Sequence, residues 1–513
     1  MTPRSASLGR VRALALAAVM TLSACQPNRF VSGWIPYWES TDGTTAIKNA
    51  DASTLFGEVS LFWYGARADG TIGLNGSQST LTATVSALRA KGLPVVPTIA
   101  DGTGKGVMKG ILADPTSRAR HIQRIVDLVT ANNYDGIDID YEVFAFSHPR
   151  SEWGSIRPIW ITFVNELAAA LHTRGKLLSV TVPAIWNSGN SGYWLYGQPE
   201  IADAVDRLRL MVYDWSVSVA GPIAPMWWVN EVIAYSSSVV PVSKLQLGVP
   251  AYGRHWATKK FANDVCPASA VFRDSITMAE VAPLAAAHGV TPVRDASGEL
   301  TFSWLDGPNR EQVVDTAPPA FDPPGTVVPT AGAPADGSPA LAHRINSKLP
   351  FACTIQHTVY APDAASVRQR ADAAVAAGWS GIVIWAFGYE TSDLYSALAG
   401  VGAQRPNGEP YGAMDAPSVS GTSVSVGGFA LDPEFDLPVP VRITVTNAGG
   451  ATVATTTTLA RTSRAGMPTG LGPFHGFGAS YTLAPGNYTV CATLLNWGGS
   501  NGASAGCRTF TTS

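Results

Sequence analysis

Residues 135–142 read DGIDIDYE, and this stretch guides the interpretation of the whole chain. Side chains on a β-strand alternate between two faces, so Asp138, Asp140 and Glu142 share one face, while two isoleucines and a tyrosine take the other. Three acids on one side of an apolar strand are costly to bury unless their charge is used. A neighbouring carboxylate would raise the pKa of Glu142 and suit it to donate a proton near neutral pH. The pattern therefore predicts acid catalysis at the end of a strand.

A calcium loop and a solvated acidic turn are the two alternatives for the same residues. An EF-hand loop needs oxygen ligands at a fixed spacing around a central glycine, and residues 135–142 lack that spacing. Acids that alternate with isoleucine on a strand favour a chemical role.

Apolar, β-branched segments recur along the first four-fifths of the chain and alternate with helical patterns, for example at residues 122–129 and 160–171. Eight such units predict an α/β fold, a (β/α)8 TIM barrel with its chemistry at the C-terminal strand ends. The expected strands cover residues 33–38, 58–64, 93–99, 135–142, 177–183, 208–215, 245–252 and 381–387.

The D-x-x-D-x-D-x-E motif, together with M-x-Y-D at residues 211–214, resembles glycoside hydrolase family 18, the chitinase-like enzymes, over residues 31–400. The resemblance implies substrate-assisted retaining hydrolysis next to N-acetylglucosamine, without an enzyme nucleophile, cofactor or metal. It implies that Glu142 protonates the leaving oxygen and that Asp140 holds the acetamide N–H. Asp138 would hydrogen-bond Asp140 and share its proton.

The same resemblance suggests further site residues. Tyr213 and Asp214 would position the acetamide, and Trp385 would floor the subsite where the sugar is cleaved. Barrel core is the alternative for the aromatic residues, and Trp227 and Trp228 are expected to be packing residues. The remaining expected substrate-binding residues are Met211, Trp34 and Trp63.

The substrate is less constrained, because chitin, peptidoglycan and other N-acetylated glycans all carry the required acetamido group. Residues 97–100 read PTIA and depart from the S-x-G-G usual in chitinases, whereas residues 213–216 and 252–256 resemble the spore-cortex and wall-associated branch. We expect cleavage of β-1,4 bonds in peptidoglycan, with chitin as the alternative. A lectin that only binds such glycans is the rival interpretation, although lectins of this family typically replace the glutamate found here as Glu142.

The N-terminal 25 residues read as an export signal, with arginines followed by a short apolar stretch and LSAC at residues 22–25. This ending resembles a bacterial lipobox, which predicts lipidation of Cys25 and membrane contact only through that lipid. An ordinary cleaved signal peptide is the alternative. Four cysteines remain, an even number that suits an oxidising compartment, and the simplest pairing is Cys266 with Cys353 and Cys491 with Cys507.

Over a hundred residues separate the seventh and eighth predicted strands, and they predict an α+β insertion at about residues 255–356, including a capping box at residues 277–280. The barrel would then span residues 26–402. A linker at residues 403–418 would lead to an all-β sandwich at residues 419–513, which resembles a module of exported actinobacterial proteins. Whether that module binds wall or glycan or acts as a spacer stays open.

Composition supports a large globular core, since 46% of residues are hydrophobic and 14% are charged. The net charge of −3 gives no reason to expect a nucleic-acid partner, and we expect a monomer.

Overall fold

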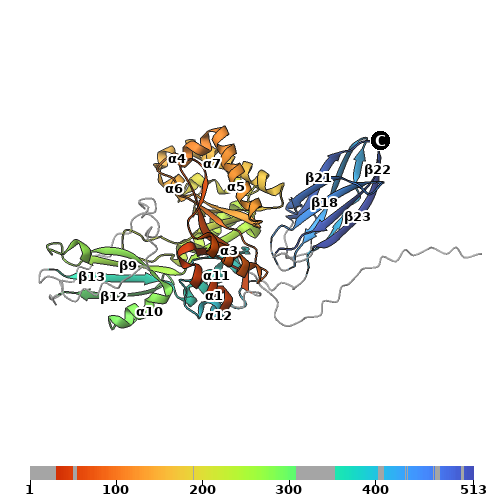
Figure 1. Cartoon of the computed structure of the whole chain (residues 1–513). Helices are drawn as coiled ribbons and strands as arrows, with labels where there is room; N and C mark the ends of the chain where they lie inside the picture. Colours follow the sequence, from red (N-terminus) through yellow and green to blue (C-terminus); the bar gives the residue numbers. More distant parts are fainter. Residues whose placement is uncertain are drawn as a thin grey trace, which may run out of the picture.

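A computed structural model describes residues 30–49, 55–188, 190–307, 353–402, 409–433, 435, 437–465, 467, 474–497 and 502–513. Cys25 and the rest of the export signal lie outside these residues, so lipidation stays a prediction. The described chain forms three parts: a barrel in the middle of Figure 1, an insertion on one side of it and a C-terminal β-domain on the other.

Eight parallel strands close into the predicted TIM barrel. Strand β1 pairs with β14 on one side and with β2 on the other, which completes the ring in the order β1-β14-β8-β7-β6-β5-β4-β2. Each strand is almost wholly buried, as expected for a parallel sheet covered by helices. The strands are β1 (Val31–Pro36), β2 (Phe56–Ala66), β4 (Thr98–Asp101), β5 (Gly136–Asp140), β6 (Leu177–Pro183), β7 (Arg207–Met211), β8 (Leu245–Pro250) and β14 (Gly381–Trp385).

Helices cover the outside of the ring, and α5 shows how the sequence defines them. Asp114 caps its start by accepting a hydrogen bond from the Ser117 backbone N–H, and proline occupies the first helical position. Buried residues at positions 121, 122, 125, 126 and 129 form the face that packs on the barrel. The longer helices are α3 (Gln78–Arg89), α5 (Pro115–Ala131), α7 (Trp153–His172), α9 (Met226–Val239) and α11 (Ala364–Ala376).

In its described residues, the insertion between β8 and β14 is an antiparallel sheet with one α-helix, α10 (Met278–Ala287), as predicted. This helix begins with the expected capping box of Thr277 and Glu280. The sheet starts at Tyr252 and ends at Ala361, so it extends beyond the expected bounds on both sides, because its first strand leaves the barrel directly after β8. Its strand order is β10-β9-β13-β12-β11, with β9 (Tyr252–Lys259), β10 (Phe272–Thr277), β11 (Val293–Arg294), β12 (Leu300–Asp306) and β13 (Ile355–Ala361).

Both predicted disulfides are confirmed. Cys266 bonds Cys353 within the insertion, and Cys491 bonds Cys507 between two neighbouring strands of the C-terminal domain.

The C-terminal domain consists of two antiparallel sheets that share one hydrophobic core, with Val424 and Val426 from one sheet and Ile443 and Val490 from the other. Residues 411–414, expected in the linker, instead form β15 and pair with β17. Burial of Met414 in the core accounts for the difference. The sheets contain β15 (Tyr411–Met414), β16 (Ser418–Ser420), β17 (Ser423–Leu431), β20 (Thr462–Ser463) and β21 (Phe474–Thr482), and then β18 (Pro440–Asn447), β19 (Thr452–Leu459), β22 (Gly486–Leu494) and β23 (Ala503–Thr512).

This β-domain docks on the base of the barrel, where the strands begin. Leu177, the first residue of β6, shares a buried cluster with residues of the domain that include Leu437 and Trp497. Arg461 reaches from the β-domain to the buried carboxylate of Asp206, immediately before β7, with Arg461 Nε 2.9 Å from Asp206 Oδ1. The C-terminal ends of the barrel strands therefore lie at the opposite end of the barrel from the β-domain.

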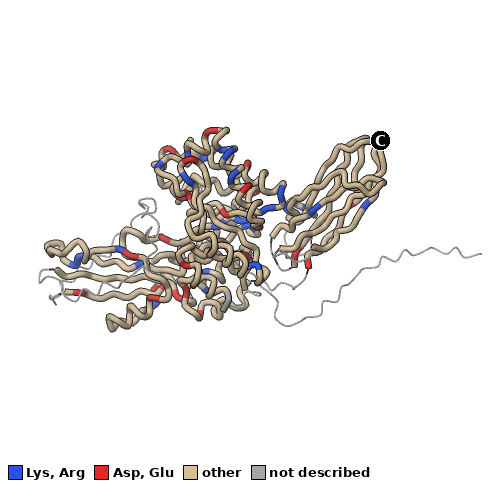
Figure 2. The backbone as a smooth tube through the Cα atoms, in the orientation of Figure 1, with Lys and Arg blue, Asp and Glu red and all other residues tan. Residues whose placement is uncertain are grey.

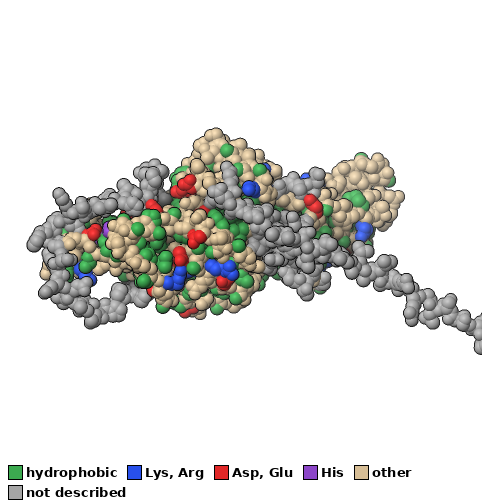
Figure 3. Space-filling model, turned by 90° about the horizontal axis from the view of Figure 1, so that it is seen from below, with side chains coloured by type: hydrophobic (Ala, Val, Ile, Leu, Met, Phe, Trp, Pro, Cys, Tyr) green, Lys and Arg blue, Asp and Glu red, His purple; other side chains and the backbone are tan. Residues whose placement is uncertain are grey.

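Charges of both signs are interspersed over the described chain (Figure 2), and hydrophobic side chains are scattered among them on the face shown in Figure 3. No helix in the described ranges combines the length and apolar character needed to cross a bilayer.

Candidate active site

The three acids of the motif sit at increasing height along the end of β5. Asp138 is fully buried and Asp140 is 6% exposed, both on the strand. Glu142 is half-buried and is the first residue of the short helix α6 (Glu142–Phe146), two residues past the end of the strand. The arrangement places the deepest acid inside the barrel and the outermost acid at its catalytic end.

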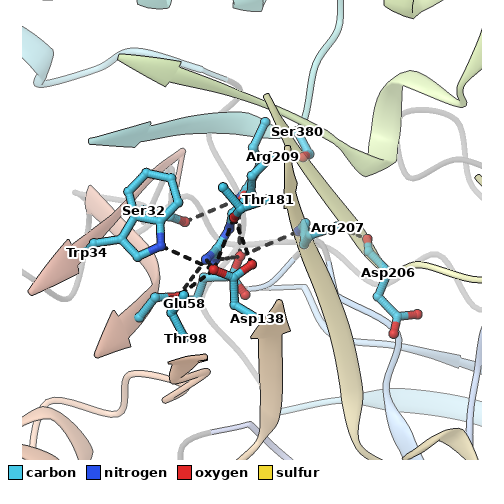
Figure 4. Close-up of polar contacts among 12 residues, drawn as sticks. Ser32, Trp34, Glu58, Thr98, Asp138, Thr181, Asp206, Arg207, Arg209 and Ser380 are labelled. Atoms are coloured by element: carbon cyan, nitrogen blue, oxygen red, sulfur yellow. Dashed lines mark hydrogen bonds and ion pairs between the residues drawn. The ribbon is translucent and has the colours of Figure 1, made fainter. Parts of the chain in front are cut away.

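Asp138 is held by a set of donors from the surrounding strands (Figure 4). Its carboxylate accepts hydrogen bonds from Trp34 Nε1 at 3.2 Å, Thr98 Oγ1 at 2.8 Å and Thr181 Oγ1 at 2.9 Å. These donors, and not the expected hydrogen bond with Asp140, are the contacts that fix the Asp138 side chain.

Arg209 places a positive charge beneath this carboxylate. Its Nη2 lies 3.0 Å from Glu58 Oε1, Nη1 donates to Ser60 Oγ at 2.6 Å, and Nε donates to Gln246 Oε1 at 2.9 Å. The Arg209 side chain is fully buried, so each donor needs these partners. Sequence reasoning missed this network, although Arg209 has the same strand parity as Tyr213 and so points into the barrel.

Asp140 is the acid with an unused acceptor. Burial raises the pKa of Asp140 well above its ordinary value, and the charges of Glu142 and then Asp138 raise it further. Its Oδ1 is buried and has no hydrogen-bond partner within the described part of the chain. A buried polar atom without a partner is uncommon in proteins, and at the end of a barrel strand it marks a position where a ligand group can bind.

Glu142 holds its proton up to neutral pH. Burial, followed by the charge of Asp214, raises its pKa to about 7. A carboxylic acid with this pKa can both donate and recover a proton near neutrality, as general acid–base catalysis requires.

Asp214 is fixed by two residues of the insertion that were not expected in the site. Tyr252 donates its hydroxyl to Asp214 Oδ1 at 2.5 Å, and Arg254 Nη2 lies 2.7 Å from the same oxygen. Asp214 has a left-handed backbone with φ of 62°. Tyr213 beside it is half-buried, with its ring centroid 6.0 Å from that of Tyr252. The first strand of the insertion thus forms one wall of the site.

Trp385 is half-buried at the end of β14. Its ring centroid lies 4.9 Å from that of Phe62 and 5.7 Å from that of Trp34. Trp34 is only 1% exposed beneath it, so it supports the site by donating to Asp138 and does not line an open groove. Trp63 is fully buried and donates to the Ile35 carbonyl, so its expected role as a groove residue is wrong. Met211 ends β7 and is 9% exposed.

Residues behind the site hold the turn between Asp140 and Glu142 through hydrogen bonds to Tyr141. The Tyr141 hydroxyl lies 2.7 Å from His121 Nε2, and the Tyr141 carbonyl accepts the Tyr196 hydroxyl at 2.8 Å. The backbone that carries both acids is therefore anchored on two sides.

A glutamate with a raised pKa and a buried aspartate at the C-terminal end of a TIM-barrel strand are the groups that acid-catalysed hydrolysis of a glycosidic bond requires. The model of the glycosyl hydrolases family 18 matches residues 34–390, and the chain belongs to this family.

Individual relatives agree with this assignment. A Bacillus subtilis protein named "putative sporulation-specific glycosylase YdhD" is 27% identical over 203 residues, which cover 39% of this chain and 46% of that protein. The chain therefore matches about half the length of this relative. A chitinase from Chromobacterium violaceum aligns with a TM-score of 0.53 and 21% identity, covering 72% of this chain and 98% of that one. The spore cortex-lytic enzyme SleL of Bacillus megaterium aligns with a TM-score of 0.55 and 16% identity, covering 75% of this chain and 77% of that one. The two structures support the fold.

Proposed function

We propose that the protein hydrolyses β-1,4 bonds next to N-acetylglucosamine by substrate-assisted retaining catalysis. The observation that carries the proposal is the pairing of Glu142, whose pKa is about 7, with Asp140, whose buried Oδ1 has no partner among the described residues. Glu142 donates its proton to the glycosidic oxygen of the leaving sugar. No second carboxylate needs to attack, because the acetamido oxygen of the substrate takes that role in substrate-assisted enzymes.

Asp140 and its neighbours stabilise the charge that develops on the acetamido group. Asp140 binds the acetamide N–H, and its burial strengthens that electrostatic interaction. Tyr213 donates its hydroxyl to the acetamide oxygen, while Asp214, held by Tyr252 and Arg254, keeps that side of the subsite in place. Trp385 provides the apolar floor under the sugar.

Peptidoglycan is the substrate that we favour, with chitin as the alternative. The similarity to a sporulation-specific glycosylase supports the first, and the chitinase-like family supports the second. We further propose that the protein is exported, because two disulfides suit an oxidising compartment, and that lipid on Cys25 anchors it to the membrane surface.

The test is hydrolysis of a fluorogenic tri-N-acetylchitotrioside by the full chain, compared with Glu142→Gln. Loss of the general acid is expected to reduce kcat/KM by about 10²- to 10⁴-fold. The matched control is Glu166→Gln, an exposed glutamate of α7 paired with Arg118, which should keep full activity. Retention is checked by NMR, where the first product formed should be the β-anomer.

Two outcomes would contradict the proposal. Equal turnover by the wild type and Glu142→Gln would remove Glu142 from the mechanism. Saturable sugar binding without turnover, on both the trisaccharide and purified cell wall, would indicate the lectin instead. Product analysis on purified peptidoglycan and on chitin then separates the two substrates.

A further inference from the structure

Four tryptophans gather beside the candidate site, at the C-terminal ends of β6 and β7. Trp215 is the centre of the group, with its ring centroid 5.8 Å from Trp186, 5.1 Å from Trp228 and 4.6 Å from Trp227. Trp186 and Trp228 are 9% and 4% exposed and serve as the packed base. Trp227 is 47% exposed, so the expectation that it is only a packing residue is wrong.

The group is continuous with the site already described. Trp215 directly follows Asp214, which the proposed function places at the acetamido group. Trp186 lies three residues past the end of β6, and Trp227 is the second residue of α9, which follows the β7 loop. The exposed indole of Trp227 therefore lies at the catalytic end of the barrel, on the side of Asp214.

A buried ion pair fixes the end of the loop that carries Trp215 and leads into α9, the helix of Trp227 and Trp228. Glu299 of the insertion accepts hydrogen bonds from the backbone N–H groups of Ile223 at 2.7 Å and Ala224 at 2.6 Å. Arg370 Nη2 lies 3.0 Å from the same carboxylate, and both side chains are buried. The backbone N–H of Trp215 in turn donates to the Ile223 carbonyl at 2.8 Å. The aromatic surface is thus preorganised before any ligand arrives, as binding surfaces on rigid supports are.

We infer that Trp227, supported edge-on by Trp215, is a stacking platform for a sugar ring of the glycan that lies beyond the cleaved bond. The inference rests on the proposed function. A pyranose ring presents a face of C–H groups that packs on an indole, while its hydroxyl groups remain in water. A sugar ring is therefore the ligand that best fits an indole held rigidly in solvent next to a polysaccharide site.

The experiment compares two substrates of different length on Trp227→Ala in the full chain. Hydrolysis of a fluorogenic di-N-acetylchitobioside should stay within about twofold of the wild type, because this ligand has no sugar ring beyond the bond that releases the fluorophore. Hydrolysis of N-acetylchitohexaose should lose about 3- to 10-fold in kcat/KM, the effect expected for one aromatic contact. Trp227→Phe should recover most of the loss. The matched control is Tyr411→Ala, an aromatic residue of the β-domain that is 46% exposed.

The two substrates distinguish failure of this inference from failure of the proposed function. If the wild type does not cleave the short substrate, the proposed function fails. If it cleaves both substrates and Trp227→Ala lowers neither or lowers both equally, the platform is overturned. A direct readout is calorimetric binding of N-acetylchitohexaose to Glu142→Gln, which Trp227→Ala should weaken by the same factor. A change in oligomeric state of Trp227→Ala on gel filtration would show a second copy of the chain as the occupant and would also overturn the platform.

Discussion

Arg209 Nη1 lies 3.4 Å from Asp138 Oδ2 at the centre of the barrel, and both side chains are fully buried. The same guanidinium contacts Glu58 on the opposite side of the barrel interior. The Arg209 guanidinium therefore balances the negative charge of Asp138, the deepest acid of the motif.

Removal of this cation should destabilise the barrel. Arg209→Met leaves Asp138 buried without its counter-charge and leaves Glu58 with Arg207 alone, 3.8 Å away. Loss of one partner of a buried ion pair typically costs about 3–5 kcal/mol. The measurement is the free energy of unfolding from denaturant titration. Arg368→Ala, which breaks an exposed pair with Asp372, should change it by less than about 1 kcal/mol. A small effect of Arg209→Met would mean that water or neighbouring donors replace the guanidinium.

The pH dependence of hydrolysis should report the proton on Glu142. Its pKa is about 7, raised by burial and then by Asp214, so activity that needs the protonated acid should fall as the pH rises through about 7. Asp214→Asn removes a negative charge that favours the protonated form, so the pKa of Glu142 should decrease and the alkaline limb should move to lower pH. The measurement is kcat/KM against pH for both proteins. An unmoved limb in Asp214→Asn would contradict the coupling.

Tyr252→Phe tests whether the insertion positions the site. The variant removes one charge-assisted hydrogen bond from Asp214 and leaves those of Arg254. Such bonds contribute about 1.5–3 kcal/mol, so kcat/KM should fall at least about tenfold while the fold is kept. Tyr235→Phe on α9 is the control and should be silent. Loss of melting temperature in step with activity would indicate a structural role for Tyr252 instead.

Arg461 should couple the β-domain to the barrel in a pH-dependent way. Burial alone would raise the pKa of Asp206, but His172 and Arg461 hold it well below its ordinary value of 3.8. A depressed carboxyl pKa stabilises the fold above the unfolded value, and that contribution is lost as the pH falls below it.

Arg461→Ala should therefore lower the melting temperature at pH 7 by several degrees and reduce the difference in stability between pH 7 and pH 3. Arg464→Ala, which breaks an exposed pair within the β-domain, is the control. Equal melting temperatures of wild type and Arg461→Ala would show that the pair of Arg461 with Asp206 does not stabilise the docked β-domain.

The sequence predicted those features that depend on local patterns. The capping box at Thr277 is readable because all its groups lie within one helical turn. The acids of β5 are readable because strand parity alone sets their face. Strand parity could also have corrected the prediction that Trp63 lines the groove. Glu58 and Phe62 point into the barrel, so Trp63, the residue after Phe62, must point outward.

The remaining site residues depend on contacts between distant segments. Tyr252 and Arg254 reach Asp214 only because β9 turns away from the barrel at the end of β8, and no local pattern specifies that direction. The burial of Trp34 depends on how deep the barrel lumen is at that position, and the exposure of Trp227 depends on how its neighbouring tryptophans fill the space beneath it. These outcomes are set by packing across the whole ring of strands.

The position of the β-domain has a practical consequence for experiments on surfaces. Because the domain covers the base of the barrel, and Figure 1 shows the chain's C-terminal end on the far side of that domain, a tag fused after Ser513 would attach the protein by the end remote from its catalytic opening. A bead or sensor chip loaded in this way should present every groove outward, toward a suspended polysaccharide.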